Sequence, residues 1–162
     1  MTLARQGDLP FVDEHSLTID APRERVWEAL LDVAPAGFEG AVASRFARLL
    51  GCEPARAAGP RPLAAGSTFP AFEVTRAEEA TRLELVGRHR FSRYALVFKL
   101  TDDAGGTRLA AETWAEFPGV HGRAYRAAVI GTRGHVVAVR RILPAVARRS
   151  RRSGVALRVP RE

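Results

Sequence analysis

Hydrophobic residues recur at helical spacing in the last third of the chain, between Gly119 and Val146. When successive positions are placed about 100° apart, the apolar and small side chains fall within an arc of about 120°. Arg126, Arg133 and Arg140 fall on the opposite side. The pattern predicts one long amphipathic helix whose buried stripe consists of Val120, Ala124, Ala127, Ala128, Gly131, His135, Ala138, Val139, Ile142 and Val146.

The middle of this stripe carries Ala124, Ala127, Ala128 and Gly131, where a tightly packed helix usually carries leucine or isoleucine. Small side chains on a helix face serve one of two ends: they let the helix pack closely against a sheet, or they leave room for a ligand. We interpret them as one wall of a small-molecule cavity, with close packing as the alternative.

Apolar and polar residues alternate from Phe11 to Asp20, which predicts a β-strand. One face of this strand is expected to carry Phe11, Asp13, His15, Leu17 and Ile19. Pro22 suits the first turn of a helix, because its fixed φ angle and missing N–H cost nothing there. Two short helices are expected to follow the strand, from Arg23 to about Val33 and from Ala41 to Leu50.

The stretch from Ser67 to Phe117 has the alternation and the turn residues of consecutive antiparallel strands. Breaks are predicted near residues 79–80, 90–92 and 102–106, the last as a hairpin turn. The predicted order is therefore one strand, two short helices, a run of antiparallel strands and one long helix. Such an order belongs to the α+β class and fits a single domain.

The composition adds a few limits. At 162 residues the chain is long enough to bury a core without cross-links. Cys52 is the only cysteine, which rules out an internal disulfide and a cysteine-rich metal site. No apolar run is long enough for a signal peptide or a membrane-spanning helix. We therefore expect a cytoplasmic protein.

The net charge of +7 is concentrated near the C-terminus. Residues 119–162 contain eleven arginines and one acidic residue, so the rest of the chain is mildly acidic. The arginines either form a solvated helix face and tail or attract an anionic membrane or nucleic acid. The tail has no aromatic side chains that could stack on bases, so nucleic acid is not an expected partner. A weak contact with anionic membranes stays open.

The segment Leu17 to Pro22, followed by Val26 and Trp27, forms an I-x-A-P-x-x-x-V-W element ahead of the strand-rich middle and the terminal amphipathic helix. In these features the chain resembles the START-like helix-grip proteins, the SRPBCC superfamily of polyketide cyclases, lipid-transfer domains and plant ligand carriers. The stretches GRHRFSRYALVF and FPGVHGRAYRAAVIGTRGH are similar to those of a bacterial subgroup. The resemblance implies a curved antiparallel β-sheet wrapped around the C-terminal helix, with a deep, mainly apolar cavity between them.

On this basis the chain divides into an N-terminal extension (1–10), a single helix-grip domain (11–147) and a basic C-terminal tail (148–162). The residues expected to line the cavity are apolar or carry one polar group that could hold a ligand. They are Phe69, Phe72, Leu85, His89, Tyr94, Leu96, Trp114, Tyr125, Gly131 and His135.

His135, His89 and Glu112 are the candidates for acid–base catalysis, because imidazole and carboxylate groups can exchange protons near neutral pH. The two histidines also have ordinary structural explanations, a core histidine for His135 and a solvated strand end for His89. Glu112, if it faces the cavity, is either a partner for an arginine or a base, and strand alternation alone does not decide which way it points. His121 and His135 would lie about 21 Å apart along a helix, too far to share a metal ion. No metal or other cofactor is expected.

We therefore expect a carrier or sensor that binds a hydrophobic small molecule or lipid between the sheet and the last helix. Two alternatives stay open. One is an enzyme of the polyketide cyclase or aromatase kind that uses the same pocket. The other is a protein that contacts a membrane or nucleic acid through its basic tail. The sequence does not decide whether there is catalysis.

Overall fold

The computed structural model describes residues 6–38, 45, 48–119, 121, 124 and 134–152, with the backbone alone at residues 6 and 134–139. None of the helices in these ranges is both long and apolar enough to cross a membrane. In chain order the elements are a short 3₁₀ helix η1 (Gln6–Asp8), β1 (Phe11–Ile19), α1 (Arg23–Ala36), β2 (Thr68–Phe69), β3 (Phe72–Glu78), β4 (Arg82–His89), β5 (Ser92–Asp103), β6 (Gly106–Glu116) and α4 (Gly134–Arg152).

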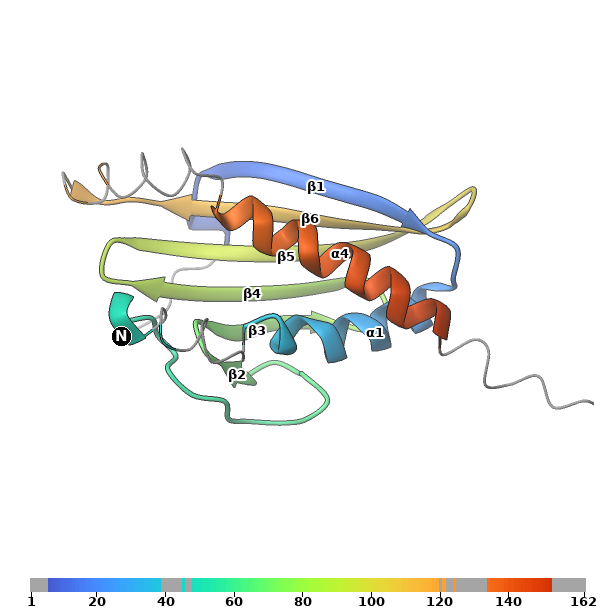
Figure 1. Cartoon of the computed structure of the whole chain (residues 1–162), viewed down its shortest axis with the longest axis horizontal. Helices are drawn as coiled ribbons and strands as arrows, with labels where there is room; N and C mark the ends of the chain where they lie inside the picture. The colour runs from blue at the N-terminus through green and yellow to red at the C-terminus, as the bar shows by residue number, and fades with distance from the viewer. Residues whose placement is uncertain are drawn as a thin grey trace, which may run out of the picture.

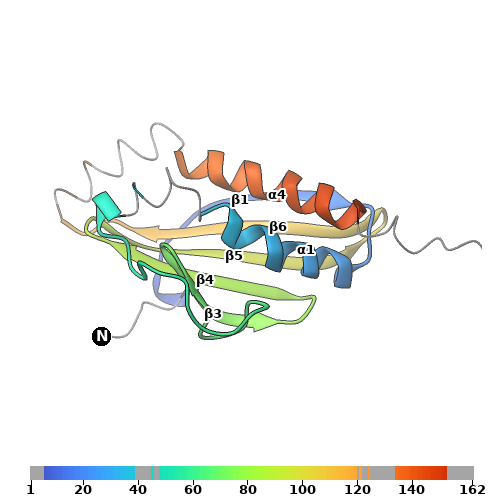
Figure 2. The same ribbon diagram turned by 60° about the horizontal axis from the view of Figure 1, so that its bottom comes forward.

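The strands form one curved antiparallel sheet in the order β1-β6-β5-β4-β3-β2 (Figure 1). α1 and α4 pack against each other and lie on the same side of this sheet (Figure 2). We call the face toward these helices the inner face and the opposite one the outer face. A curved antiparallel sheet with the C-terminal helix across one face confirms the predicted α+β helix-grip architecture.

The hydrophobic core lies between the inner face and the two helices. α1 contributes Val26, Trp27 and Leu30, which the sequence placed on its apolar side, and the sheet contributes large residues such as Phe98. Ile142 and Val146, from the predicted stripe of the last helix, are also buried there. Each such side chain contributes roughly 1.5–3 kcal/mol of hydrophobic free energy. The described end of the predicted stripe therefore packs as expected.

The three predicted breaks in the strand-rich region are turns between β3, β4, β5 and β6. The last turn is tied to the first strand. Asp103 accepts a hydrogen bond from the Thr18 hydroxyl at 2.6 Å and another from the Ala104 N–H at 2.8 Å. These hydrogen bonds, with the Thr18 bond the larger effect, lower the pKa of the Asp103 carboxyl.

The prediction for Phe11 was wrong. A β-bulge between Phe11 and Asp13 shifts the register against β6, so that Phe11 pairs with Trp114 on the outer face. The two rings meet edge to face, with centroids 5.2 Å apart, and the Phe11 side chain is 54% exposed. One extra residue in a strand reverses the face of everything beyond it. Asp13 and the residues after it keep the predicted inner face.

Two helices are longer than predicted. α1 continues through Pro35 to Ala36, because a proline in the last turn removes only its own N–H from the hydrogen-bond pattern. α4 continues to Arg152, past the predicted end at Val146 and into the segment predicted as a tail. Ser150 is buried, and its hydroxyl donates to the Val146 carbonyl at 2.9 Å. Packing of this last turn extends the helix.

Other predicted helical segments fall partly outside the described ranges. In the predicted second helix, Arg45 and residues 48–50 are helical, and the other positions from Ala41 are not described. Residues 119, 121 and 124 are helical, in agreement with a helix start at Gly119, and the remaining residues before Gly134 also lie outside the description. The division into extension, domain and tail stays a prediction.

Candidate functional site

The inner face of the sheet is apolar over most of its area. Leu85 and Leu96 are cross-strand partners on β4 and β5, and both are buried. Beside them Phe69 and Phe72 make ring contacts with Phe38, which follows α1. Six of the residues predicted to line a ligand site lie together on this face, namely Phe69, Phe72, Leu85, His89, Tyr94 and Leu96.

Three polar side chains interrupt this apolar face at the β1 edge of the sheet. Asp13 and His15 alternate with Leu17 on β1, and Thr113 of β6 is the register partner of Asp13. Oδ2 of Asp13 lies 3.4 Å from Nε2 of His15, and the two side chains are 26% and 25% exposed. We call Asp13, His15 and Thr113 the inner-face polar group.

Two buried atoms of this group have no hydrogen bond to any residue that the structure describes. Within the described part of the chain, neither Nε2 of His15 nor Oγ1 of Thr113 has a hydrogen-bond partner of ordinary geometry. Leaving a buried polar atom unpaired costs about 1–3 kcal/mol, so native proteins rarely do so without a reason. A polar atom of a ligand placed here would recover that free energy.

The inner-face polar group combines three kinds of hydrogen-bonding chemistry. An ionised carboxylate accepts, a hydroxyl donates or accepts, and a neutral imidazole does one at each nitrogen. Together Asp13, His15 and Thr113 can hold a hydroxyl or carbonyl group of an otherwise apolar molecule. No cluster of three or more histidine, cysteine or acidic side chains suited to a metal ion occurs among the residues that the structure describes.

The side chain of His89 is hydrogen-bonded within the turn between β4 and β5. Its Nδ1 accepts a hydrogen bond from the Phe91 N–H at 3.1 Å, which leaves the proton of the neutral ring on Nε2, 2.9 Å from Oγ of Ser92. Burial lowers the pKa of the His89 imidazole. The ring is therefore neutral near pH 7, and the observed contacts favour the structural explanation over the catalytic one.

Tyr94 lies next to His89, with ring centroids 5.6 Å apart. Its hydroxyl donates to the carbonyl of Ala71, in the turn between β2 and β3, at 3.0 Å. The hydroxyl also bonds to the thiol of Cys52, whose pKa is raised by burial and lowered by this bond, with burial the larger effect. Tyr94 thus ties three segments together on one side of the aromatic cluster.

Glu112 and Trp114 do not join this site, although both were candidates. They lie on the outer face, because Thr113 between them points inward with Leu109 and Ala111. Glu112 forms an ion pair with Lys99 and accepts a hydrogen bond from the Trp114 indole N–H at 3.1 Å. Glu112 therefore faces away from the predicted cavity and pairs with a lysine, so it is not placed to act as an acid–base group there.

The remaining candidates belong to the last helix. Tyr125 and Gly131 lie outside the described residues, and His135 is in the first turn of α4 with only its backbone described. His121 is exposed. The predicted contribution of this helix to the site stays a prediction.

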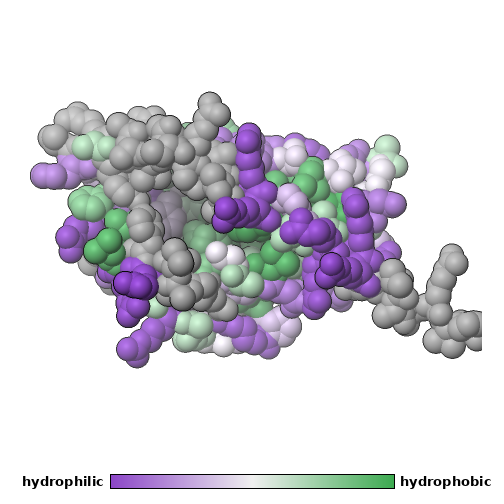
Figure 3. All heavy atoms as spheres, in the orientation of Figure 1, coloured by the Kyte–Doolittle hydropathy of each residue, from purple (hydrophilic) through white to green (hydrophobic). Residues whose placement is uncertain are grey.

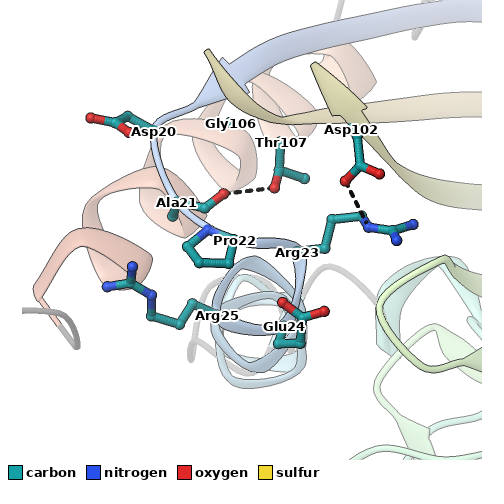
Figure 4. Close-up of a pocket in the computed structure, with 9 residues that line it drawn as sticks. All are labelled: Asp20, Ala21, Pro22, Arg23, Glu24, Arg25, Asp102, Gly106 and Thr107. Atoms are coloured by element: carbon teal, nitrogen blue, oxygen red, sulfur yellow. Dashed lines mark hydrogen bonds and ion pairs between the residues drawn. The ribbon is translucent and has the colours of Figure 1, made fainter. Parts of the chain in front are cut away.

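A separate pocket of about 340 Å³ lies at the beginning of α1, at the far end of β1 from Asp13 (Figure 4). Several of the polar groups that line it are already paired within the fold. Arg23 pairs with Asp102 at 3.0 Å, and the Thr107 hydroxyl donates to the Ala21 carbonyl at 2.7 Å. None of the sequence-predicted site residues lines this pocket, so it is not part of the candidate site.

Asp13 and His15 are the site residues that sequence reasoning did not single out. The signal was present, because two ionisable residues occupied the inward positions of an otherwise apolar strand, where burial of polar groups is costly. Thr113 carried no comparable signal: a threonine is common in strands on either face. Only the register between β1 and β6 brings it opposite Asp13.

No protein-family model matches the chain, and comparison with the curated proteins gives no significant match. Solved structures do resemble it. TTHA0849 from Thermus thermophilus gives a TM-score of 0.55 at 14% sequence identity, over 89% of this chain and 99% of that one. Ara h 8.0201 gives 0.48 at 12% identity, over 85% and 95%. CalU16 from Micromonospora echinospora gives 0.46 at 17% identity, over 88% and 82%.

At this level of identity the similarity concerns the fold. It extends over nearly the whole length of TTHA0849, and it agrees with the strand order and with the two helices on one face of the sheet. The chain therefore has the START-like helix-grip fold, the fold of the superfamily that its sequence resembles.

Proposed function

We propose that this protein binds a hydrophobic small molecule bearing a hydroxyl or carbonyl group, between the inner face of the sheet and α4. The observation that carries the proposal is the inner-face polar group. Thr113 and His15 each hold a buried polar atom with no hydrogen-bond partner in the described ranges, on a face that is mostly apolar. A mostly apolar wall with a few convergent polar groups is the usual character of a small-molecule site.

The surroundings of the polar group support the same function. Leu85, Leu96 and Phe98 supply an apolar floor beside it. The space-filling view shows the surface hollowed on the side of the molecule that carries α4, with hydrophobic residues in the hollow (Figure 3). A ligand there would lay its apolar part on the leucine and phenylalanine side chains and its polar atom toward β1. Either a carrier or a sensor would use such a site.

The first experiment is native mass spectrometry of the protein purified from its own source, followed by extraction of what is bound. A stoichiometric apolar compound with a hydroxyl or carbonyl group is the expected result. Its chemistry would also separate a lipid from an aromatic ligand. Recovery of the protein without a bound compound would mean that the site is not occupied in the source cell. The probe experiment below then tests whether the site can bind a ligand.

The probe experiment compares 2-naphthol with 2-methylnaphthalene, which has the same ring system without the hydroxyl. We expect Thr113→Val to weaken 2-naphthol binding about five- to tenfold, since one hydrogen bond contributes roughly 1 kcal/mol. Binding of 2-methylnaphthalene should be unchanged. Thr101→Val, at an exposed position of β5, is the matched control and should affect neither probe. Equal affinities of all variants for both probes would rule out the polar anchor.

The Asp13–His15 pair favours a second candidate, an acid–base enzyme that uses the same pocket. A carboxylate beside an imidazole can hold the ring in a fixed orientation, which a general base needs. 5-Nitrobenzisoxazole is a suitable probe, because removal of its ring C–H proton by a base opens the ring to a coloured phenolate. Acceleration above free imidazole that His15→Gln abolishes would favour catalysis. A wild-type rate no faster than free imidazole would leave binding as the function.

A further inference from the structure

The exposed side of α4 is a row of arginines. The helix contains Arg140, Arg141, Arg148, Arg149, Arg151 and Arg152 and no acidic residue, and all of these arginines are exposed. The space-filling view shows hydrophilic residues gathered over α4 and the adjoining α1 (Figure 3). Because the helix continues to Arg152, the last four arginines have fixed directions around a helix axis.

Helical spacing sorts this part of α4 into two faces. At about 100° per residue, five of the arginines fall within an arc of about 120°. The opposite arc contains Ile142, Leu143, Val146, Ala147 and Ser150, all of them buried. The row from residue 140 to residue 152 is about 18 Å long. We call Arg140, Arg141, Arg148, Arg151 and Arg152 the arginine face.

Among the residues that the structure describes, this charge is largely uncompensated. Arg149, outside the arginine face, pairs with Asp32 of α1 at 3.0 Å. No ion pair between the arginine face and an acidic side chain is found within residues 6–38, 45, 48–119, 121, 124 and 134–152. Glu24, Glu28 and Asp32 are exposed on α1 at intervals of one helical turn. They lie on the helix that packs against α4, so acidic side chains run along the neighbour of the arginine-rich helix.

We propose that the arginine face docks the protein onto an anionic phospholipid surface. A planar array of phosphate groups can reach all five guanidinium groups at once, because they project from one side of one helix over about 18 Å. Pro144 and Ala145, the other partly exposed residues of this face, are too small to insert deeply into the acyl region. The contact is therefore electrostatic, reversible and confined to the headgroups.

The geometry fits a membrane better than a nucleic acid. A helix that reads DNA enters a major groove about 12 Å wide and is contacted from more than one side. Half of α4 is packed against α1 and the sheet, so only its other side could face a groove. Among its described side chains, the exposed ones include no asparagine, glutamine or aromatic residue that could contact bases. This proposal does not depend on the proposed ligand.

The test is flotation of the purified full chain with phosphatidylcholine vesicles that contain either no anionic lipid or about 30% phosphatidylserine. We expect binding to the anionic vesicles alone, and its loss when NaCl rises from about 0.1 M to about 0.5 M, since screening then acts within a few ångströms. Each arginine near an anionic surface is worth about a fivefold factor in affinity. Arg140→Glu/Arg148→Glu/Arg151→Glu should thus lower vesicle binding more than 100-fold.

The matched control is Arg45→Glu/Arg56→Glu/Arg90→Glu, which makes the same change in net charge at exposed positions outside α4. It should lower binding less than tenfold. Circular dichroism verifies that both triple variants fold, and the corresponding glutamine variants replace them if they do not. Equal losses in the two triple variants would mean that net charge, not the arginine face, attracts the membrane. Absence of vesicle binding, or salt-resistant binding to duplex DNA in its place, would overturn the proposal.

Discussion

Gly87 and Tyr94 are cross-strand partners on β4 and β5, and the tyrosine ring covers the space that a side chain on Gly87 would need. A Cβ atom built on Gly87 would lie 2.7 Å from the Tyr94 ring and 1.9 Å from the carbonyl oxygen of Ala71. We expect Gly87→Ala to lower the free energy of unfolding by about 2–3 kcal/mol, because both neighbours must move. Urea denaturation measures this loss.

Gly105→Ala is the control for that substitution. Gly105 lies in the turn between β5 and β6, and a Cβ atom there would meet only a methyl group of Thr18, at 3.5 Å. Its effect should stay within about 0.5 kcal/mol. Similar losses from both substitutions would show that backbone freedom, and not the approach of Tyr94, explains the glycine at position 87.

Removal of the Tyr94 hydroxyl gives a second prediction. Its hydrogen bond holds the carbonyl of Ala71, whose φ of 76° lies in the left-handed region that non-glycine residues rarely adopt. Tyr94→Phe should therefore cost about 1 kcal/mol of stability, the usual net contribution of one hydrogen bond. A thermal shift compared with Gly87→Ala checks the size. No loss would mean that the turn keeps its conformation without the tyrosine.

The same substitution should change the reactivity of Cys52. The hydrogen bond between Tyr94 and this thiol lowers the thiol pKa against the larger, raising effect of burial. In Tyr94→Phe only burial remains, so the pKa should rise further and the thiolate should form at higher pH. The rate of alkylation by iodoacetamide, followed against pH, should shift upward relative to the parent protein. An unchanged profile would exclude the hydrogen bond as a determinant.

Much of the fold could be predicted because alternation and helical spacing are local properties. The succession of strands and helices along the chain, the three turns and the packed end of the last helix follow from them. The side of the sheet on which a strand's residues lie is not local. Glu112 and Thr113 are neighbours on β6, and alternation could not tell which of them faces the helices. The bulge after Phe11 left no trace in the pattern, and it moved that residue to the outer face.

The candidate site was predictable to the same extent. Leu85, Leu96 and Tyr94 share the inner face as expected, because their alternation is regular. Asp13 and His15 were placed on the correct face, and their importance emerges only when the register brings Thr113 opposite them. Hydrogen bonds formed by His89 and Tyr94 within the fold are also invisible in the sequence. Distances and partners, more than residue types, decide which polar side chains remain available for a ligand.

His89 should make stability depend on pH. Burial lowers the pKa of its imidazole below the ordinary value of 6.5, so protons bind the unfolded chain more readily than the folded one. Its contribution is fully present above pH 6.5 and is lost as the pH falls through the lowered folded pKa. His89→Gln should flatten this acid-side decline in urea titrations, whereas His121→Gln, at an exposed position, should not. Identical declines in both variants would assign the effect to other groups.

The substitution Glu112→Gln tests whether the outer face of the sheet takes part in ligand binding. The Glu112 side chain is 9% exposed and pairs with Lys99, which is 42% exposed, so loss of the charge should cost about 1–2 kcal/mol, less than for a fully buried pair. Glutamine can still accept the hydrogen bond from Trp114. Glu116→Gln, whose partner Arg93 is 53% exposed, is the control and should cost at most about 1 kcal/mol. Neither variant should change the affinity for 2-naphthol, because both carboxylates lie on the outer face. A loss of 2-naphthol binding in Glu112→Gln alone would place the ligand on the outer face, beside Trp114, and would contradict the proposed site.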